Sequence, residues 1–164
     1  MQTTILNSSQ ISFTLQRMAL QIAEDWHTVT RTVHVIGVVG AGEVVANILQ
    51  QHLQKYFEQV PVHTVHLNKA FPEEVAINPA TNFTQQFVLL VDDVSNSGKT
   101  LLYAMKPLLQ QHPAGIKTAV LVERLHKQFP IQPNYVGVSL ATTLQDHIVV
   151  QVNNQSLEQA YLTN

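Results

Sequence analysis

Residues 88–100 hold the side chains of this sequence that are best suited to chemistry. The apolar run 88–91 ends in two adjacent carboxylates, Asp92 and Asp93, and a small-residue loop with a glycine, a lysine and a threonine follows. Loop amides and the start of a helix attract a phosphate monoester, because unpaired N–H groups and the helix dipole favour an anion. Paired carboxylates suit a vicinal diol or a hydrated Mg2+. Together these groups fit a ribose 5-phosphate.

Residues 98–100, Gly-Lys-Thr, look like the end of the loop that binds nucleoside triphosphates. That motif needs another glycine five positions before the glycine that precedes its lysine. In this chain the position is occupied by Asp93. The spacing therefore excludes a triphosphate loop of this type.

A second glycine-containing turn, residues 39–42, follows a strand-like run and is similar to a dinucleotide-binding fingerprint. The third glycine of that fingerprint is replaced by Val45, and the next apolar run, residues 60–67, does not end in an acid for a ribose. These departures argue against a dinucleotide site. A tight strand-to-helix connection explains the turn as well as a ligand loop does.

The composition is that of an ordinary globular protein. With 164 residues, of which 45% are apolar, we expect one domain over residues 1–164 with a full core. The chain has no cysteine, which excludes disulfides and thiolate chemistry. Residues 2–10 are polar, and no apolar run approaches the roughly 18 residues of a membrane span. We therefore expect a cytoplasmic protein with no membrane partner.

The charges make nucleic acid an unexpected partner. Nine Lys and Arg residues stand against eleven Asp and Glu residues, and the basic ones are scattered singly. A protein that neutralises many phosphates usually presents a basic face.

The nearest pair among the eight histidines, His63 and His66, would lie on opposite faces of a strand, which argues against a shared metal ion.

Strand and helix patterns alternate along the chain. Helices are predicted over residues 11–26, 44–53 and 101–110, and strands over residues 33–39, 60–67, 87–91, 118–122, 135–138 and 148–152. Ser8 or Ser9 can cap the first helix, and Pro107 breaks the last one near Lys106. Residues 68–85 have little periodicity and are predicted as a loop or a short excursion.

This alternation predicts an α/β fold with three layers, in which helices flank a mainly parallel, twisted sheet. In such sheets ligands bind at the carboxyl ends of the strands. Asp92 and Asp93, the turn at Gly40, and the neighbours Glu123 and Arg124 all follow predicted strands. We expect them to converge on one cleft.

Residues 88–100 resemble the phosphoribosyl-pyrophosphate signature of type I phosphoribosyltransferases: a strand, two acids, a small-residue loop and Gly-Lys-Thr. Residues 119–126, with 129–131 and 134–137, resemble the pyrimidine-operon attenuator / uracil phosphoribosyltransferase group. The likeness covers nearly the whole chain, with a gap around residues 70–86. It implies the type I fold with a hood over the substrate, Mg2+ as cofactor and a homodimer.

The resemblance assigns roles to the matching segments. Asp92 and Asp93 would hold the ribose hydroxyls, with or near Mg2+. The loop that would cradle the 5-phosphate comprises Ser95, Asn96, Ser97, Gly98, Lys99 and Thr100. The turn that would bind pyrophosphate comprises Val39, Gly40, Ala41 and Gly42.

The resemblance also implies residues that contact the base and two basic residues that bind the substrate. Tyr135 would lie against the base, and the backbone of Val136 would bond to its edge. Lys69, near the start of the hood, and Arg124 are further substrate-binding candidates. The implied reaction is displacement of pyrophosphate from ribose C1 by a base nitrogen through an oxocarbenium-like state. Such a reaction depends on positioning and on charge stabilisation of the leaving group.

Three departures from the family pattern bear on activity. The turn 39–42 lacks the Lys or Arg often found there. The hood is short, and residues 70–86 contain no Lys or Arg but carry Glu73 and Glu74. The loop position that carries an acid in hypoxanthine/guanine enzymes is Asn96, which cannot act as a general base and counts against a purine substrate.

The sequence thus predicts a protein that binds phosphoribosyl pyrophosphate and transfers the phosphoribosyl group to a pyrimidine such as uracil. The alternative is a regulatory protein that senses phosphoribosyl pyrophosphate or a nucleotide without catalysis, and the missing cations favour it. RNA attenuation, the other role of the resembling group, needs a basic surface, which the few basic residues do not supply.

Overall fold

The computed structural model describes residues 2–29 and 32–163, and a six-stranded sheet forms its centre. The strands are β2 (Val33–Val38), β3 (Val62–Leu67), β4 (Val75–Asn78), β5 (Phe87–Ser95), β6 (Gly115–Arg124) and β7 (Tyr135–Leu140). They lie in the order β4-β3-β2-β5-β6-β7, and all neighbours are parallel except β3 and β4. The predicted, mainly parallel sheet is confirmed, but its edge strand β4 lies within residues 68–85, where no strand was predicted.

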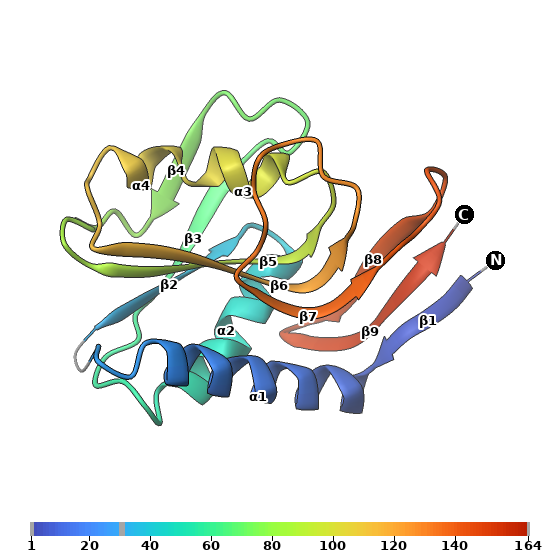
Figure 1. Cartoon of the computed structure of the whole chain (residues 1–164), viewed down its shortest axis with the longest axis horizontal. Coiled ribbons are helices and arrows are strands. Elements are labelled where there is room, and N and C mark those ends of the chain that lie inside the picture. The colour runs from blue at the N-terminus through green and yellow to red at the C-terminus, as the bar shows by residue number, and fades with distance from the viewer. Residues whose placement is uncertain (1, 30–31, 164) are drawn as a thin grey trace.

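Helices cover both faces of this sheet (Figure 1). The helices α1 (Ser8–Asp25) and α2 (Ala41–Leu53) lie on one face, and the short helices α3 (Lys99–Ala104) and α4 (Lys106–Leu109) lie on the other. Each helical layer packs on its own cluster of buried apolar side chains. The three-layer α/β arrangement is confirmed, as is the break in the helix after the loop. None of the described helices has the length and apolar character needed to cross a membrane.

The first helix starts at Ser8 because Asn7, rather than Ser8 or Ser9, caps it. The Asn7 side chain accepts a hydrogen bond from the Gln10 amide, and the Gln10 side chain accepts one from the Asn7 amide, both at 2.9 Å. This reciprocal capping box satisfies two amides that a helix start leaves unpaired.

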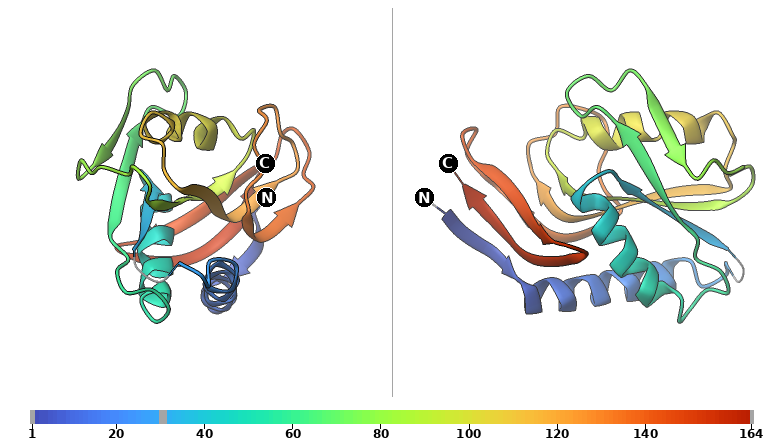
Figure 2. Two further views of the ribbon diagram at one scale, coloured as in Figure 1. Left: turned by 60° about the vertical axis from the view of Figure 1, so that its left-hand side comes forward. Right: turned by 180° about the vertical axis from the view of Figure 1, so that it is seen from behind.

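The two ends of the chain build a second sheet that was not predicted. The strands β1 (Gln2–Asn7), β8 (His147–Asn153) and β9 (Ser156–Thr163) form an antiparallel sheet in the order β1-β9-β8. Figure 2 shows these strands side by side, with both ends of the chain at one edge of the molecule. Most side chains of β1 are exposed, so this strand lacks the apolar pattern by which a strand is recognised in a sequence.

His34 and His63 form a buried pair on the neighbouring strands β2 and β3. His34 Nδ1 and His63 Nε2 are 3.0 Å apart, and both rings meet Phe83 edge-on. Burial lowers the pKa of both side chains, and the charge of His63 lowers the pKa of His34 further. His66 is exposed while His63 is buried, so these two lie on opposite faces, as predicted.

We expect mild acid to destabilise the protein through this pair. Because the folded pKa values lie below the ordinary value of 6.5, the unfolded chain binds more protons once the pH falls below about 6.5. The stability is therefore full above that pH and is lost as the pH falls through the lowered folded values. Urea unfolding at pH 7.5 and pH 5 measures how much the free energy of unfolding falls between the two pH values. We expect this decrease to be smaller by about 1 kcal/mol in His63→Gln than in the wild type. An unchanged pH dependence in His63→Gln, with exposed His66→Gln as the control, would contradict this.

Candidate functional site

The predicted phosphate loop and both carboxylates line one pocket at the carboxyl end of β5. The pocket has a volume of about 280 Å³ and is lined by residues 92–101, by Lys69, and by Ile148, Val149 and Val150 of β8. The predicted residues that the structure brings together here are Lys69, Asp92, Asp93, Ser95, Asn96, Ser97, Gly98, Lys99 and Thr100. The residues of β8 were not predicted for this site.

Asp92 is a buried acid at the base of the pocket. Its side chain is 1% exposed, and its Oδ1 accepts a hydrogen bond from the Asp93 amide at 2.9 Å. Lys69 Nζ lies 3.5 Å from Asp92 Oδ1 and 3.9 Å from Asp93 Oδ1. Burial raises the pKa of Asp92 well above its ordinary value, and the neighbouring Asp93 carboxylate raises it further, against the opposing effect of Lys69. Hydroxyl donors or a cation arriving here would stabilise the charged form.

The donor set of this pair fits a hydrated Mg2+. Within residues 2–29 and 32–163 no group of three or more His, Asp or Glu side chains is placed to hold a metal ion. Two carboxylates in one pocket suit a Mg2+ that keeps most of its water and takes further oxygens from a bound phosphate, which is a usual mode for this ion. The Lys69 ammonium group supplies positive charge at the same carboxylates.

The phosphate loop, residues 95–100, packs against residues 128–131. Gly98 has φ +84°, and a Cβ at this position would lie 2.6 Å from Ile131 Cγ2. The carbonyl oxygen of Ser97 accepts hydrogen bonds from the amides of Gln128 and Phe129, both at 3.0 Å. Glycine is therefore required at position 98, because any side chain would be strained and would displace this support.

Ser95 places a hydroxyl group without a partner in the pocket wall. The residue is 3% exposed, and among the described residues its Oγ is the buried side-chain oxygen or nitrogen that finds no hydrogen-bond partner. An unpaired buried hydroxyl costs about 1–3 kcal/mol of stability. The Oγ is covered by protein atoms, so a ligand oxygen could bond to it only after the side chain turned toward the pocket.

Lys99 lines the pocket, but its ammonium group is bonded elsewhere. Its Nζ donates to the carbonyl oxygen of Ala70 at 2.9 Å, and its amide donates to Ser97 Oγ at 3.3 Å. Lys106 Nζ likewise donates to the carbonyl of Glu73 at 3.3 Å. These lysines tie the segment 70–86, expected as a short hood, to the layer of α3 and α4.

The turn 39–42 packs against Asp92 without lining the pocket that contains Asp92 and Asp93. A Cβ on Gly42 would lie 3.0 Å from Asp92 Oδ1. The amide of Gly40 donates to Glu43 Oε2 at 2.8 Å, and Thr64 Oγ1 donates to Glu43 Oε1 at 2.9 Å. The structure thus places this turn beside Asp92, as predicted, but with an acidic side chain across it that the sequence did not reveal.

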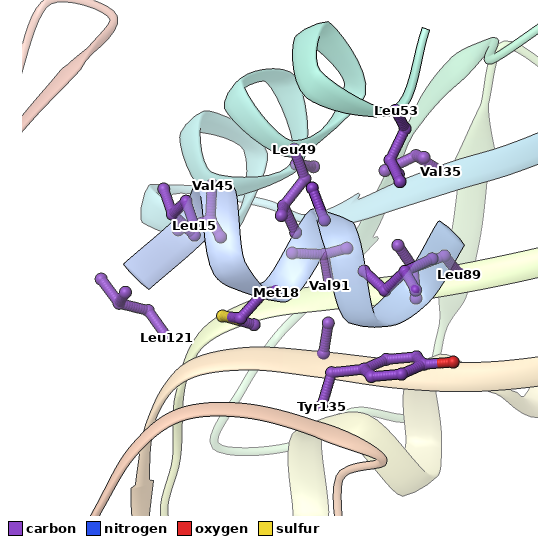
Figure 3. Packing of buried hydrophobic residues seen from close by; sticks show 14 of the residues in the cluster. Leu15, Met18, Val35, Val45, Leu49, Leu53, Leu89, Val91, Leu121 and Tyr135 are labelled. Atoms are coloured by element: carbon purple, nitrogen blue, oxygen red, sulfur yellow. The ribbon is translucent and has the colours of Figure 1, made fainter. Parts of the chain in front are cut away.

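Tyr135 and Val136 do not reach the pocket, which corrects the expectation that they contact the base. The Tyr135 ring belongs to the core cluster under α1, where Figure 3 shows it, and its hydroxyl donates to the Asp25 carboxylate. The carbonyl of Val136 accepts a hydrogen bond from Arg17 at 3.2 Å. The physical reason is position: Tyr135 begins β7, whereas ligands bind at the carboxyl ends of parallel strands.

Arg124 also lies away from the pocket. Its Nε donates to Thr142 Oγ1 at 2.6 Å, and its guanidinium group also donates to the carbonyl of Thr143. It therefore fixes the connection that leads to β8 instead of facing a phosphate. Its neighbour Glu123 is 3% exposed and pairs with Lys127 Nζ at 3.3 Å.

Comparisons with known proteins agree with this geometry. A family model described as "Phosphoribosyl transferase domain" matches residues 1–156. The chain is 29% identical over 155 residues to the Bifunctional protein PyrR of Streptococcus pneumoniae, covering 90% of this chain and 88% of that protein. This match confirms the resemblance to the pyrimidine-operon attenuator / uracil phosphoribosyltransferase group.

Solved structures share the fold. A hypoxanthine-guanine phosphoribosyltransferase from Bacillus anthracis has a TM-score of 0.75 at 21% identity, covering 90% of this chain and 86% of that one. A hypoxanthine phosphoribosyltransferase of Trypanosoma cruzi has a TM-score of 0.80 at 15% identity, covering 96% and 95%. At these identities the likeness concerns the fold and not the base. The chain belongs to the phosphoribosyl transferase domain family, as a type I phosphoribosyltransferase fold.

Proposed function

We propose that the protein binds phosphoribosyl pyrophosphate and transfers its phosphoribosyl group to a pyrimidine base, with uracil as the first base to test. The observation that supports this most is one pocket that offers three kinds of surface. It contains a buried carboxylate at Asp92, an unpaired hydroxyl at Ser95 and apolar side chains at residues 148–150. The carboxylate suits a sugar, the hydroxyl suits a phosphate, and the apolar side chains suit a base.

In the proposed complex each part of the ligand has its own place. The 5-phosphate lies in the loop 95–100 and accepts a hydrogen bond from Ser95 Oγ. The ribose hydroxyls donate to Asp92 and Asp93. The base lies against residues 148–150 of β8, which takes the role first expected of Tyr135.

The proposed reaction exchanges one bond at ribose C1. The bond from C1 to the pyrophosphate oxygen breaks, the bond from C1 to a ring nitrogen of the base forms, and the proton of that nitrogen leaves to solvent. Asp92 and Asp93 orient the ribose and oppose the positive charge that develops on its ring. A bound Mg2+ would supply charge neutralisation to the ribose and pyrophosphate oxygens.

Two observations favour a pyrimidine over a purine. Asn96 lines the pocket at a position where an acid would be needed to accept a proton from a purine, and an amide cannot do so. The similarity to PyrR extends over 90% of the chain. The structural neighbours act on hypoxanthine or guanine by their names, so both purines belong in the test.

A steady-state assay with phosphoribosyl pyrophosphate, Mg2+ and uracil tests the proposal, with uridine 5′-monophosphate measured by mass spectrometry. We expect turnover with uracil that exceeds turnover with hypoxanthine or guanine. The control is the double variant Asp92→Asn/Asp93→Asn. Uracil turnover no higher in the wild type than in this variant would refute the enzymatic activity.

A non-catalytic sensor of phosphoribosyl pyrophosphate or a nucleotide is the second candidate. The hydrogen bond between the Gly40 amide and Glu43 supports it, because this bond puts a negative charge where the pyrophosphate leaving group is expected. Tight nucleotide binding in calorimetry, without product in the assay, would identify a sensor. In line with the family resemblance we further propose a homodimer in the cytoplasm.

A further inference from the structure

The turn between β2 and α2 carries its own acid, Glu43. Its Oε2 accepts a hydrogen bond from the Gly40 amide at 2.8 Å, and its Oε1 accepts one from Thr64 Oγ1 at 2.9 Å. The side chain therefore spans the turn toward β3 and is held at both carboxylate oxygens. The amide that such a turn offers to an anion is already bonded to an anion.

This turn lies immediately beside Asp92. A Cβ on Gly42 would lie 3.0 Å from Asp92 Oδ1 and 3.2 Å from Asp92 Cα. Asp92 therefore contacts the turn and also lines the same pocket as the phosphate loop, residues 95–100. C1 and C4, the atom that carries C5, lie on the two sides of the ring oxygen of a ribose, so the group on C1 and the 5-phosphate leave the ring in different directions. A ribose with its 5-phosphate in the loop and its hydroxyls at Asp92 therefore directs C1 toward the turn.

Two further acids lie near the turn. A cavity of about 690 Å³ that includes Val39 of the turn is also lined by Glu73 and Glu74, both exposed. Lys69 is the cation that faces Asp92, and its side chain is 47% exposed. A diphosphate on C1 would meet these carboxylates, whereas a neutral base would not.

We infer that Glu43 is a specificity-determining residue, which disfavours a diphosphate on C1 and thereby selects nucleoside 5′-monophosphates over phosphoribosyl pyrophosphate. This inference rests on the proposed function, in which phosphoribosyl pyrophosphate still binds and reacts but binds more weakly than the nucleotide product. Like charges a few ångströms apart near a protein surface repel by amounts that change affinity tenfold or more. Glu43 acts on the leaving group's end of the ligand only.

Calorimetric titrations of the wild type and of Glu43→Gln test the inference, with inorganic pyrophosphate, phosphoribosyl pyrophosphate and uridine 5′-monophosphate as the probes. Glutamine keeps an acceptor for the Gly40 amide and removes the charge. We expect Glu43→Gln to bind both pyrophosphate compounds about tenfold more tightly, and uridine 5′-monophosphate with nearly unchanged affinity. The exposed Glu58→Gln variant makes the same charge change away from the turn and should leave all three affinities unchanged.

Equal pyrophosphate affinities in the wild type and in Glu43→Gln, whether measurable or undetectable, overturn the inference. So does a gain of the same size in Glu58→Gln, which would make it an effect of net charge. If neither protein binds uridine 5′-monophosphate, the proposed function fails, while the titration with inorganic pyrophosphate still decides the role of Glu43. Glu43→Ala, which also frees the Gly40 amide, gives a second measurement that should shift in the same direction.

Discussion

Replacing Asp92 with asparagine is expected to make the protein more stable at pH 8 and to weaken its affinity for ribose 5-phosphate compounds about a hundredfold. The carboxyl group is 1% exposed, and burial together with Asp93 raises its pKa above the ordinary value of 3.8. A raised folded pKa means that the group favours folding below about pH 4 and opposes it as the pH rises through the folded value. Asparagine removes this opposition and can still accept the hydrogen bond from the Asp93 amide.

The expected gain at pH 8 is about 1–3 kcal/mol in the free energy of unfolding, and it should disappear near pH 4. The expected loss in affinity is about a hundredfold, because hydrogen bonds from ribose hydroxyls to a charged acceptor contribute about 1.5–3 kcal/mol each. Urea unfolding at pH 4 and pH 8 gives the first quantity, and calorimetry with uridine 5′-monophosphate gives the second. If the variant is less stable than the wild type at pH 8, the buried Asp92 carboxylate does not oppose folding and this prediction is wrong. Glu58→Gln, an exposed acid, is the control for net charge.

Replacing Gly98 with alanine should reduce nucleotide affinity by a factor of ten or more. The residue has φ +84°, and a Cβ would lie 2.6 Å from Ile131 Cγ2. Alanine therefore either strains the backbone or moves the loop, at a cost of about 1–3 kcal/mol. Calorimetry with uridine 5′-monophosphate and thermal unfolding measure the two effects.

Two further variants separate the loop from general stability. Ile131→Ala in the Gly98→Ala background removes the clash but not the backbone strain, so it should restore only part of the affinity. Gly115→Ala meets Phe87 at 3.2 Å at the start of β6, away from the pocket, and should change stability alone. Full nucleotide affinity in Gly98→Ala would contradict the assignment of this loop to the phosphate.

The sequence predicts the part of the site that is continuous in the chain. Asp92, Asp93 and the loop 95–100 follow one another directly, so a strand and a helix that start and end near these residues bring them together. The strand was predicted to end at Val91, but β5 continues to Ser95, and α3 starts at Lys99. The central sheet could also be predicted from the sequence, because the strands of a parallel sheet covered on both faces appear as continuous apolar runs.

The part of the pocket formed by residues 148–150 depends on contacts that no local pattern reveals. Residues 148–150 are recognisable as a strand, but their place beside β5 arises from a second sheet whose other members, β1 and β9, were not predicted. Tyr135 was predicted to contact the base but packs in the core. The sequence does not distinguish an aromatic residue at the start of a strand that faces a ligand from one that faces the core. The link between Glu43 and Gly40 is local, yet a glutamate in the first turn of a helix is too common to stand out.

The central claim is that the pocket above β5 holds a phosphate together with a ribose and a base. Calorimetric titration of the wild-type protein with uridine 5′-monophosphate and with uridine, under identical conditions with Mg2+, tests it most directly. We predict that the monophosphate binds at least about a hundredfold more tightly than the nucleoside, because several charge-assisted hydrogen bonds to the phosphate are lost without it. Equal affinity for the two compounds, or no binding of the monophosphate, would contradict the assignment of the site.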